Sequence, residues 1–351
     1  MAETTASLQR PAGGRIDWVD TGKGICIILV VLMHVAGGLE AAIGQDSWID
    51  PLIAWAKQFR MPGLFLLSGL FVPRLVDLGW AAFLDRKIVP LTYFYLLWFS
   101  INALMRFPPW SEAGLSGFAQ SYALGLVDPF GVLWFIYLLT IFFVVAKAVW
   151  RWRHAALLVS AFLALAPLGT GWMVPDQFTA YFVFFLAGAV FSAGIRAATG
   201  RAAANPGKTL ILWAGWFAIS ALATPYLGHD VQSAAPGVHL LLGIAGVAGI
   251  LLSSALLAGR LPWLDYCGRN SLPIYLAFFL PMIIGRTVLL RFDLPLDPGI
   301  AALLLTAISV AVPLLMHRLV RGTPLAFLFA RPAWLGARPR SAGRQEIGSS
   351  L

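Results

Sequence analysis

Residues 15–38 read RIDWVDTGKGICIILVVLMHVAGG, a charged approach followed by an apolar run that contains a single histidine. The apolar run, from Ile25 to Ile43, is long enough to cross the roughly 30 Å hydrocarbon core of a membrane at about 1.5 Å per residue. His34 lies at its midpoint. Because an ionisable side chain at that depth is costly, it usually marks a functional site. The alternative is a structural role, in which His34 hydrogen-bonds a neighbouring helix.

The composition excludes a soluble domain. Of the 351 residues, 59% are hydrophobic and 12% are charged, whereas soluble domains are about half apolar and about a quarter charged. We therefore predict an all-α polytopic membrane helix bundle. Ten segments have spanning length, near residues 25–43, 59–78, 88–106, 131–150, 155–173, 178–195, 209–227, 237–258, 271–290 and 299–317. The two cysteines, Cys26 and Cys267, form no disulfide framework or metal cluster by their number and spacing, so no metal is expected.

The positive charges favour one topology. If the N-terminus is cytoplasmic, 20 of the 25 Lys and Arg residues fall in cytoplasmic segments, which predicts that both termini are cytoplasmic. Topology and contacts with membrane lipids then explain the net charge of +9, and no nucleic-acid partner is expected. We expect residues 1–14 to form a disordered cytoplasmic tail, residues 15–317 the membrane domain, and residues 318–351 a basic, disordered cytoplasmic tail.

Three charged residues near the ends of the first two segments are candidates for ligand binding. Asp20 and Lys23 share one helix face at the membrane boundary. Lys23 and His34 are eleven residues apart, so they lie on roughly one face and about 16 Å apart along the helix. Arg60 opens the second segment in FRMPGLFLLSG, residues 59–69, where it could orient an anionic or hydroxyl-rich acceptor or bind an oxyanion. The alternative is that these side chains only anchor or snorkel to the membrane surface.

Further along, three motifs add candidates. Ser68 and Gly69 are typical of close helix packing, and catalysis by the serine is the alternative. Trp134 lies in LWFIYLL, residues 133–139, where an aromatic belt is the simpler interpretation. Arg269 lies in GRNSLPIYLAFF, residues 268–279, and either stays among the headgroups or binds a nucleotide phosphate.

Taken together, these segments and YFVFFLAG, residues 181–188, occur in an order and spacing that resembles the acyltransferase-3 family of bacterial integral membrane proteins, in particular its fucose 4-O-acetylase-like branch. The resemblance covers roughly residues 15–317. It implies a ten-helix enzyme of the bacterial inner membrane that moves an acyl group, usually acetyl from cytoplasmic acetyl-CoA, to a hydroxyl of an envelope glycan or lipid-linked glycan.

The resemblance also assigns expected roles. His34 matches the family's essential histidine, as catalytic base or acyl carrier, and Arg60 is a candidate for catalysis and for acceptor binding. Lys23, Arg269 and Asp20 are candidates for binding acyl-CoA, and Trp110 and Trp134 for binding the acceptor. Phe278 is a departure, because many relatives carry histidine at this position, which puts in doubt any mechanism that needs a second histidine.

Two other classes of function remain open on the sequence. A transporter or exporter of an envelope glycan or glycolipid would line its path with His34 and Arg60. The second open class is a non-catalytic sensor or assembly factor. No internal repeat is evident, which argues against a transporter built from inverted halves.

Overall fold

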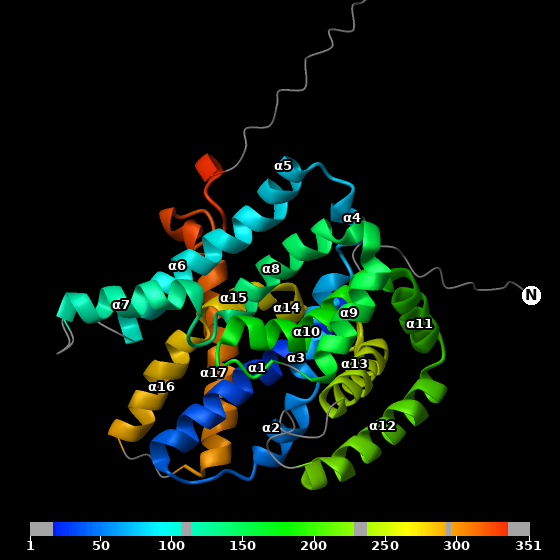
Figure 1. The fold of residues 1–351 in the computed structure, drawn as a ribbon. Helices are drawn as coiled ribbons and strands as arrows, with labels where there is room; N and C mark the ends of the chain where they lie inside the picture. The colour runs from blue at the N-terminus through cyan, green and yellow to red at the C-terminus, as the bar shows by residue number, and fades with distance from the viewer. Residues whose placement is uncertain (1–16, 107–113, 167, 228–236, 293–295, 336–351) are drawn as a thin grey trace, which may run out of the picture.

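The computed structural model describes residues 17–106, 114–166, 168–227, 237–292 and 296–335 (Figure 1). The described chain is all-helical, with 84% helix and no strand. Its α-helices are α1 (Asp17–Ile43), α2 (Asp50–Lys57), α3 (Arg60–Gly69), α4 (Pro73–Val76), α5 (Trp80–Phe83), α6 (Val89–Arg106), α7 (Gly114–Val127), α8 (Trp134–Ala148), α9 (Arg153–Leu165), α10 (Met173–Val190), α11 (Ser192–Ala204), α12 (Pro206–Leu227), α13 (Val238–Leu257), α14 (Pro262–Arg269), α15 (Ser271–Ala277), α16 (Phe279–Arg291) and α17 (Pro298–Leu319). Shorter helical turns cover Leu84–Ile88, Trp150–Trp152, Pro324–Leu328 and Ala333–Leu335.

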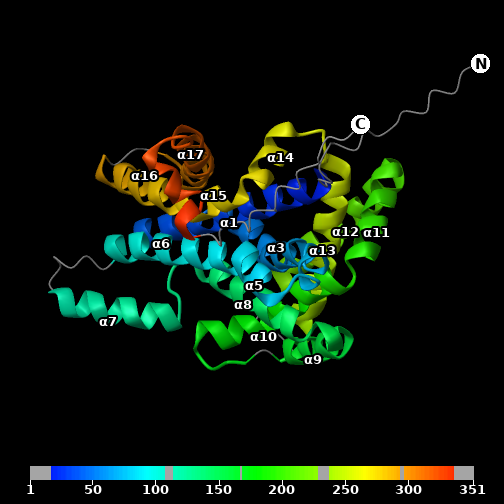
Figure 2. The same ribbon diagram turned by 90° about the horizontal axis from the view of Figure 1, so that it is seen from above.

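Helices α1 and α3 form the centre of the bundle. Figure 1 shows α7 at one edge and α11 and α12 at the opposite edge, and Figure 2 shows α16 and α17 on one side of α1 with α9 and α10 on the other. Helix α1 packs on α3, α13, α14 and α17, and α3 packs on α10 and α13. Helix α1, which carries His34, is therefore surrounded by helices from both halves of the chain.

The described helices do not confirm the ten spans expected from the sequence. Among the described residues, six single helices are long and apolar enough to cross a membrane: residues 18–43, 80–106, 173–190, 206–224, 238–257 and 298–319. Two bent pairs raise the number to as many as eight. The all-helical membrane-protein class stands, and the difference lies in residues 59–78 and 131–173.

The segment 59–78 is broken rather than continuous. Helix α3 has ten residues, which is about 15 Å at 1.5 Å per residue, roughly half of the hydrocarbon thickness. It ends at Gly69, and α4 starts with Pro73. Because proline has no backbone N–H, the carbonyl of Gly69 cannot accept the usual helical hydrogen bond and instead accepts from the Val72 N–H at 2.9 Å.

Bends account for the other differences. Helices α8 and α9 cover two of the expected segments but have only 15 and 13 residues, and the chain bends by 74° between them. Helices α15 and α16 meet at 48° around Phe278. Pro281 follows this kink by three residues and cannot donate to the carbonyl of Ala277, which is a sufficient cause for the bend.

Glycine residues allow the central helices to touch backbone to backbone. A Cβ atom on Gly24 of α1 would lie 2.3 Å from the Leu264 carbonyl oxygen of α14, and one on Gly268 of α14 would lie 1.6 Å from the Asp20 carbonyl oxygen. The same reciprocal arrangement joins α3 to α10 through Gly69 and Gly188. Glycine is the residue that permits such close approach of two helix backbones.

A buried polar pair reinforces the contact between α1 and α14. The Thr21 hydroxyl donates to Asp265 Oδ1 at 2.5 Å, and the Gly259 N–H donates to Asp265 Oδ2 at 3.2 Å. Cys26 and Cys267, on the same two helices, are buried free thiols, and burial raises the pKa of the Cys267 thiol. Their burial agrees with a packing role rather than a reactive one.

The chain beyond α17 returns to the bundle. The structure describes the chain as far as residue 335, which lies within residues 318–351, the segment expected as a disordered tail. Tyr93 and Trp98 of α6 donate to the carbonyl oxygens of Phe327 and Leu328 at 2.9 Å each. Arg331 pairs with Asp85 at 2.9 Å. These long-range contacts hold residues 327–331 on α6 and on the helical turn Leu84–Ile88 that precedes it.

Candidate functional site

His34 lies on the α1 face that meets α15 and α16. Its side chain is half-buried, and no hydrogen bond joins its ring to another residue in the described part of the chain. The ring contacts Phe278, with 5.5 Å between ring centroids. Phe278 is fully buried at the kink between α15 and α16. Phe278, at the position where many relatives carry histidine, therefore lies directly against His34, the candidate catalytic histidine.

A cavity of about 190 Å³, here called the His34 cavity, brings together three of the residues expected from the sequence. These are His34, Arg60 and Trp134. Their helices are far apart in sequence and meet because α1 packs on α3 and α10 packs on both α3 and α8. The other polar side chains in its wall are Lys57, Gln177, Tyr181 and Tyr275. Trp134 and Tyr181 stack on each other, with ring centroids 6.0 Å apart.

Arg60 is the most deeply buried charge in this cavity. It is the first residue of α3 and is only 7% exposed. Its Nε and Nη1 atoms are buried and have no hydrogen-bond partner among the described residues. A buried guanidinium with unpaired donors is costly, so this arrangement fits a site where a ligand supplies the missing acceptors.

A second cavity, here called the Lys23 cavity, has a volume of about 170 Å³ and lies along the same α1 stripe, nearer the start of the helix. Lys23 and Lys87 contribute their ammonium groups, which lie 4.9 Å from the Phe71 ring centroid and 4.4 Å from the Phe143 ring centroid. Apolar side chains complete most of the wall, including Ile27, Leu64, Leu91 and Leu139. The cavity thus combines positive charge with a long apolar lining.

An aromatic partition separates the two cavities. Phe135 and Tyr275 line both of them, and their rings meet edge to face with centroids 5.5 Å apart. The Tyr275 hydroxyl donates a short hydrogen bond to the Val132 carbonyl oxygen, which fixes the ring in place. Lys23 and His34, aligned on one helix by their spacing, therefore face different compartments.

Two residues expected at the site lie elsewhere, and a third cannot be placed because it falls outside the described residues. Arg269 is exposed on α14, with its guanidinium carbon 5.9 Å from the Tyr266 ring centroid, and it does not line the Lys23 cavity. Asp20 is half-buried and lines neither cavity; its carbonyl oxygen packs on Gly268. Trp110 lies outside the described residues.

Sequence reasoning missed several residues that the fold brings to the cavities: Lys57, Lys87, Gln177, Tyr181 and Tyr275. Two of them stood inside motifs that the sequence analysis quotes, Tyr181 in YFVFFLAG and Tyr275 in GRNSLPIYLAFF. Lys57 and Lys87 were considered only in the count of positive charges that predicted the topology. Hydropathy could not single them out, because a lysine near the end of an apolar segment has the pattern of an ordinary membrane anchor.

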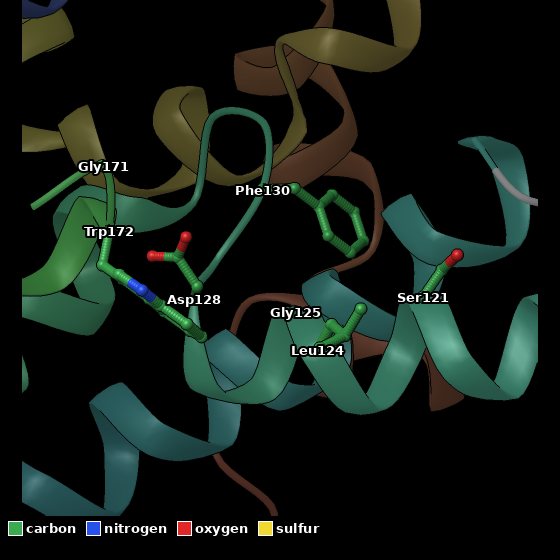
Figure 3. Close-up of a pocket in the computed structure, with 7 residues that line it drawn as sticks. All are labelled: Ser121, Leu124, Gly125, Asp128, Phe130, Gly171 and Trp172. Atoms are coloured by element: carbon green, nitrogen blue, oxygen red, sulfur yellow. The ribbon is translucent and has the colours of Figure 1, made fainter.

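Another hollow, of about 370 Å³, lies beside α7 and shares no residue with these cavities (Figure 3). Its carboxylate, Asp128, is already engaged, because it accepts the Met173 N–H at 2.8 Å. Leu124, Phe130 and Trp172 make most of the remaining wall apolar. In the part of the chain that the structure describes, no group of three metal-ligating side chains occurs.

Comparison with known families identifies the class of protein. A family model described as an acyltransferase domain, that of the acyltransferase-3 family, matches residues 16–318. The chain belongs to the acyltransferase-3 family. Searches of curated proteins and of solved structures found no match. Membership of this family, together with the apolar helices, makes the protein a membrane acyltransferase.

Proposed function

We propose that this membrane acyltransferase moves an acetyl or other short acyl group from acyl-CoA to a hydroxyl of an envelope glycan or a lipid-linked glycan. The observation that carries the proposal is the pair of cavities on one stripe of α1, one basic and apolar, the other containing His34 and Arg60. An acyl transfer between two large substrates needs such a pair of sites that meet at the reacting atoms.

The Lys23 cavity suits the acyl donor. Coenzyme A carries phosphates, which the ammonium groups of Lys23 and Lys87 would attract, and its acyl thioester arm is compatible with the apolar wall. Arg269 lies two residues before Ser271, which lines this cavity, so it is close enough in sequence to contact the nucleotide end of the donor.

The His34 cavity suits the acceptor hydroxyl. Acting as a general base, His34 removes the hydroxyl proton while the oxygen attacks the thioester carbonyl; the C–S bond then breaks and the coenzyme A thiolate takes up the proton. Acting as an acyl carrier, His34 attacks the thioester first, releases the thiol, and passes the acyl group to the hydroxyl. Both routes require the acyl group to pass Phe135 and Tyr275.

The positive charges suggest the direction of transfer. The 20-to-5 distribution of Lys and Arg supports a topology with Lys23 and both termini at the cytoplasmic face of a bacterial inner membrane and with Arg60 at the outer end of its segment. The donor would then enter from the cytoplasm and the acceptor from the other side.

The test uses sealed inside-out membrane vesicles from cells that express the protein, supplied with acetyl-CoA radiolabelled in the acetyl group. We expect label to enter the glycan fraction, with free coenzyme A released in equal amount. His34→Ala and His34→Asn should abolish transfer while leaving membrane insertion unchanged, because an apolar helix inserts readily without its polar residue. The matched control is His154→Asn, since His154 is exposed on α9 and lines neither cavity.

Full transfer by His34→Ala would refute the proposed role of His34. Glycan movement across the membrane without consumption of acetyl-CoA would refute the enzyme and favour a transporter.

A further inference from the structure

We infer that the acceptor carries a carboxylate or a phosphate group, and that Arg60 and Lys57 bind it in the His34 cavity. The inference rests on the proposed function in assigning this cavity to the acceptor, and it narrows the acceptor to an anionic class.

The wall of the His34 cavity contains fixed positive charge without acidic side chains. Lys57 and Arg60 both line it, and none of the described lining residues is Asp or Glu. Lysine and arginine offer hydrogen-bond donors and no acceptor. A neutral sugar would leave the buried Arg60 guanidinium, whose Nε and Nη1 atoms have no partner among the described residues, without a compensating charge, whereas an anion would balance it.

Arg60 supplies the second observation. It is 7% exposed, and its Nε and Nη1 atoms are buried without a hydrogen-bond partner in the described chain. A planar guanidinium with free donors matches the two oxygens of a carboxylate or phosphate in a bidentate pair. A single hydroxyl of a sugar could occupy only part of that donor set.

The position of the anion relative to the reacting hydroxyl follows from the same wall. Arg60 and His34 line one small cavity, so an acceptor held by Arg60 presents a nearby hydroxyl to His34. At about 190 Å³ the cavity is smaller than the roughly 300–1,000 Å³ typical of pockets that enclose drug-sized ligands. It would therefore receive one terminal unit of a larger acceptor, such as an acidic sugar or a phosphorylated sugar.

The experiment measures binding of three small sugars to the purified full-length protein in nanodiscs of zwitterionic lipid, without any acyl donor. The probes are glucuronate, glucose 6-phosphate and glucose, titrated by calorimetry. We expect the charged sugars to bind about 10- to 100-fold more tightly than glucose, as a charge-assisted hydrogen-bond pair would give. The tighter of the two charged sugars identifies the carboxylate or the phosphate as the preferred group.

Arg60→Gln should abolish the preference for charged sugars, and Arg60→Lys should retain part of it, since lysine keeps the charge and loses the planar fork. Lys57→Gln should reduce the preference. Arg201→Gln is the matched control, because Arg201 is exposed on α11. Elution of each variant as a single peak on size exclusion shows that it is folded.

Equal affinity for all three sugars, undetectable binding of both charged sugars, or an unchanged preference in Arg60→Gln would overturn the inference. The last result, combined with a loss of turnover, would assign Arg60 to the oxyanion of the transfer step instead. A protein that binds charged sugars through Arg60 but releases no coenzyme A would refute the proposed function and leave the anion site in place.

Discussion

The contact between α3 and α10 gives the most direct test of the architecture. A Cβ atom on Gly188 would lie 2.2 Å from the Leu66 carbonyl oxygen, about 1.2 Å short of the 3.4 Å at which ordinary contact begins. Backbone cannot rotate away as a side chain can, so Gly188→Ala must separate the two helices. Helix α3 carries Arg60 and α10 carries Gln177 and Tyr181, all in the wall of the His34 cavity.

The expected consequences are a loss of stability and a loss of transfer. Overpacking of this kind costs about 1–3 kcal/mol, and a displacement of about 1 Å at a reacting site can lower the rate about 10²-fold. The assays are thermal unfolding of the purified protein in detergent and acetyl transfer in vesicles. Gly69→Ala should behave alike, because its Cβ would lie 2.0 Å from the Phe185 carbonyl oxygen in the same crossing.

The matched control is Gly200→Ala on α11. Apart from Gly200, its chain neighbours and the nearby backbone of α11, no heavy atom lies within 4 Å of the Cβ that this substitution would add, and alanine in a helix is more stable than glycine by roughly 0.5–1 kcal/mol. It should therefore leave transfer unchanged and unfolding unchanged or slightly later. Wild-type unfolding and transfer in Gly188→Ala would refute the close crossing of α3 and α10.

Two further predictions concern the donor side. Lys23→Ala and Lys87→Ala should each raise KM for acetyl-CoA about 10- to 100-fold with a smaller effect on the acceptor, because each removes a charge-assisted contact. The control for these steady-state kinetics is Lys208→Ala, which changes an exposed lysine at the start of α12, and the same KM for acetyl-CoA in all three variants would contradict the prediction. Phe135→Ala should open the partition between the cavities and permit transfer of longer acyl groups, measured with acyl-CoA of increasing chain length beside Phe162→Ala, whose ring is 74% exposed; an unchanged chain-length limit would argue against the partition.

Hydropathy predicted the membrane helices well where a single continuous helix forms the expected span. Residues 25–43 and 299–317 were expected as spans, and α1 and α17 contain them. It did not separate segments that break, because a run of apolar residues has the same mean hydropathy whether the backbone continues or turns. Pro73 and Pro281 marked two of the breaks, but proline is tolerated in membrane helices and did not by itself decide the matter.

For the site, helical spacing placed Lys23 and His34 on one stripe of α1, and the structure agrees. The spacing carried no information on what faces that stripe. Phe135 and Tyr275 come from α8 and α15, and they divide it into two compartments. The same limit applies to Arg269, which the family resemblance made a candidate for binding acyl-CoA and which the structure leaves exposed on α14.

By itself the sequence determined the class of protein, the helix that carries His34, and the family, because apolar length, the cost of a buried imidazole and the order of motifs are properties of local stretches. Only the tertiary structure decided that Arg60 reaches the compartment of His34 with unpaired donors, and that Lys87 joins Lys23 in another. Both results depend on which helices are in contact. Backbone contacts at Gly69, Gly188 and Gly268 determine which helices pack closely, and the sequence does not show which carbonyl group each glycine will contact.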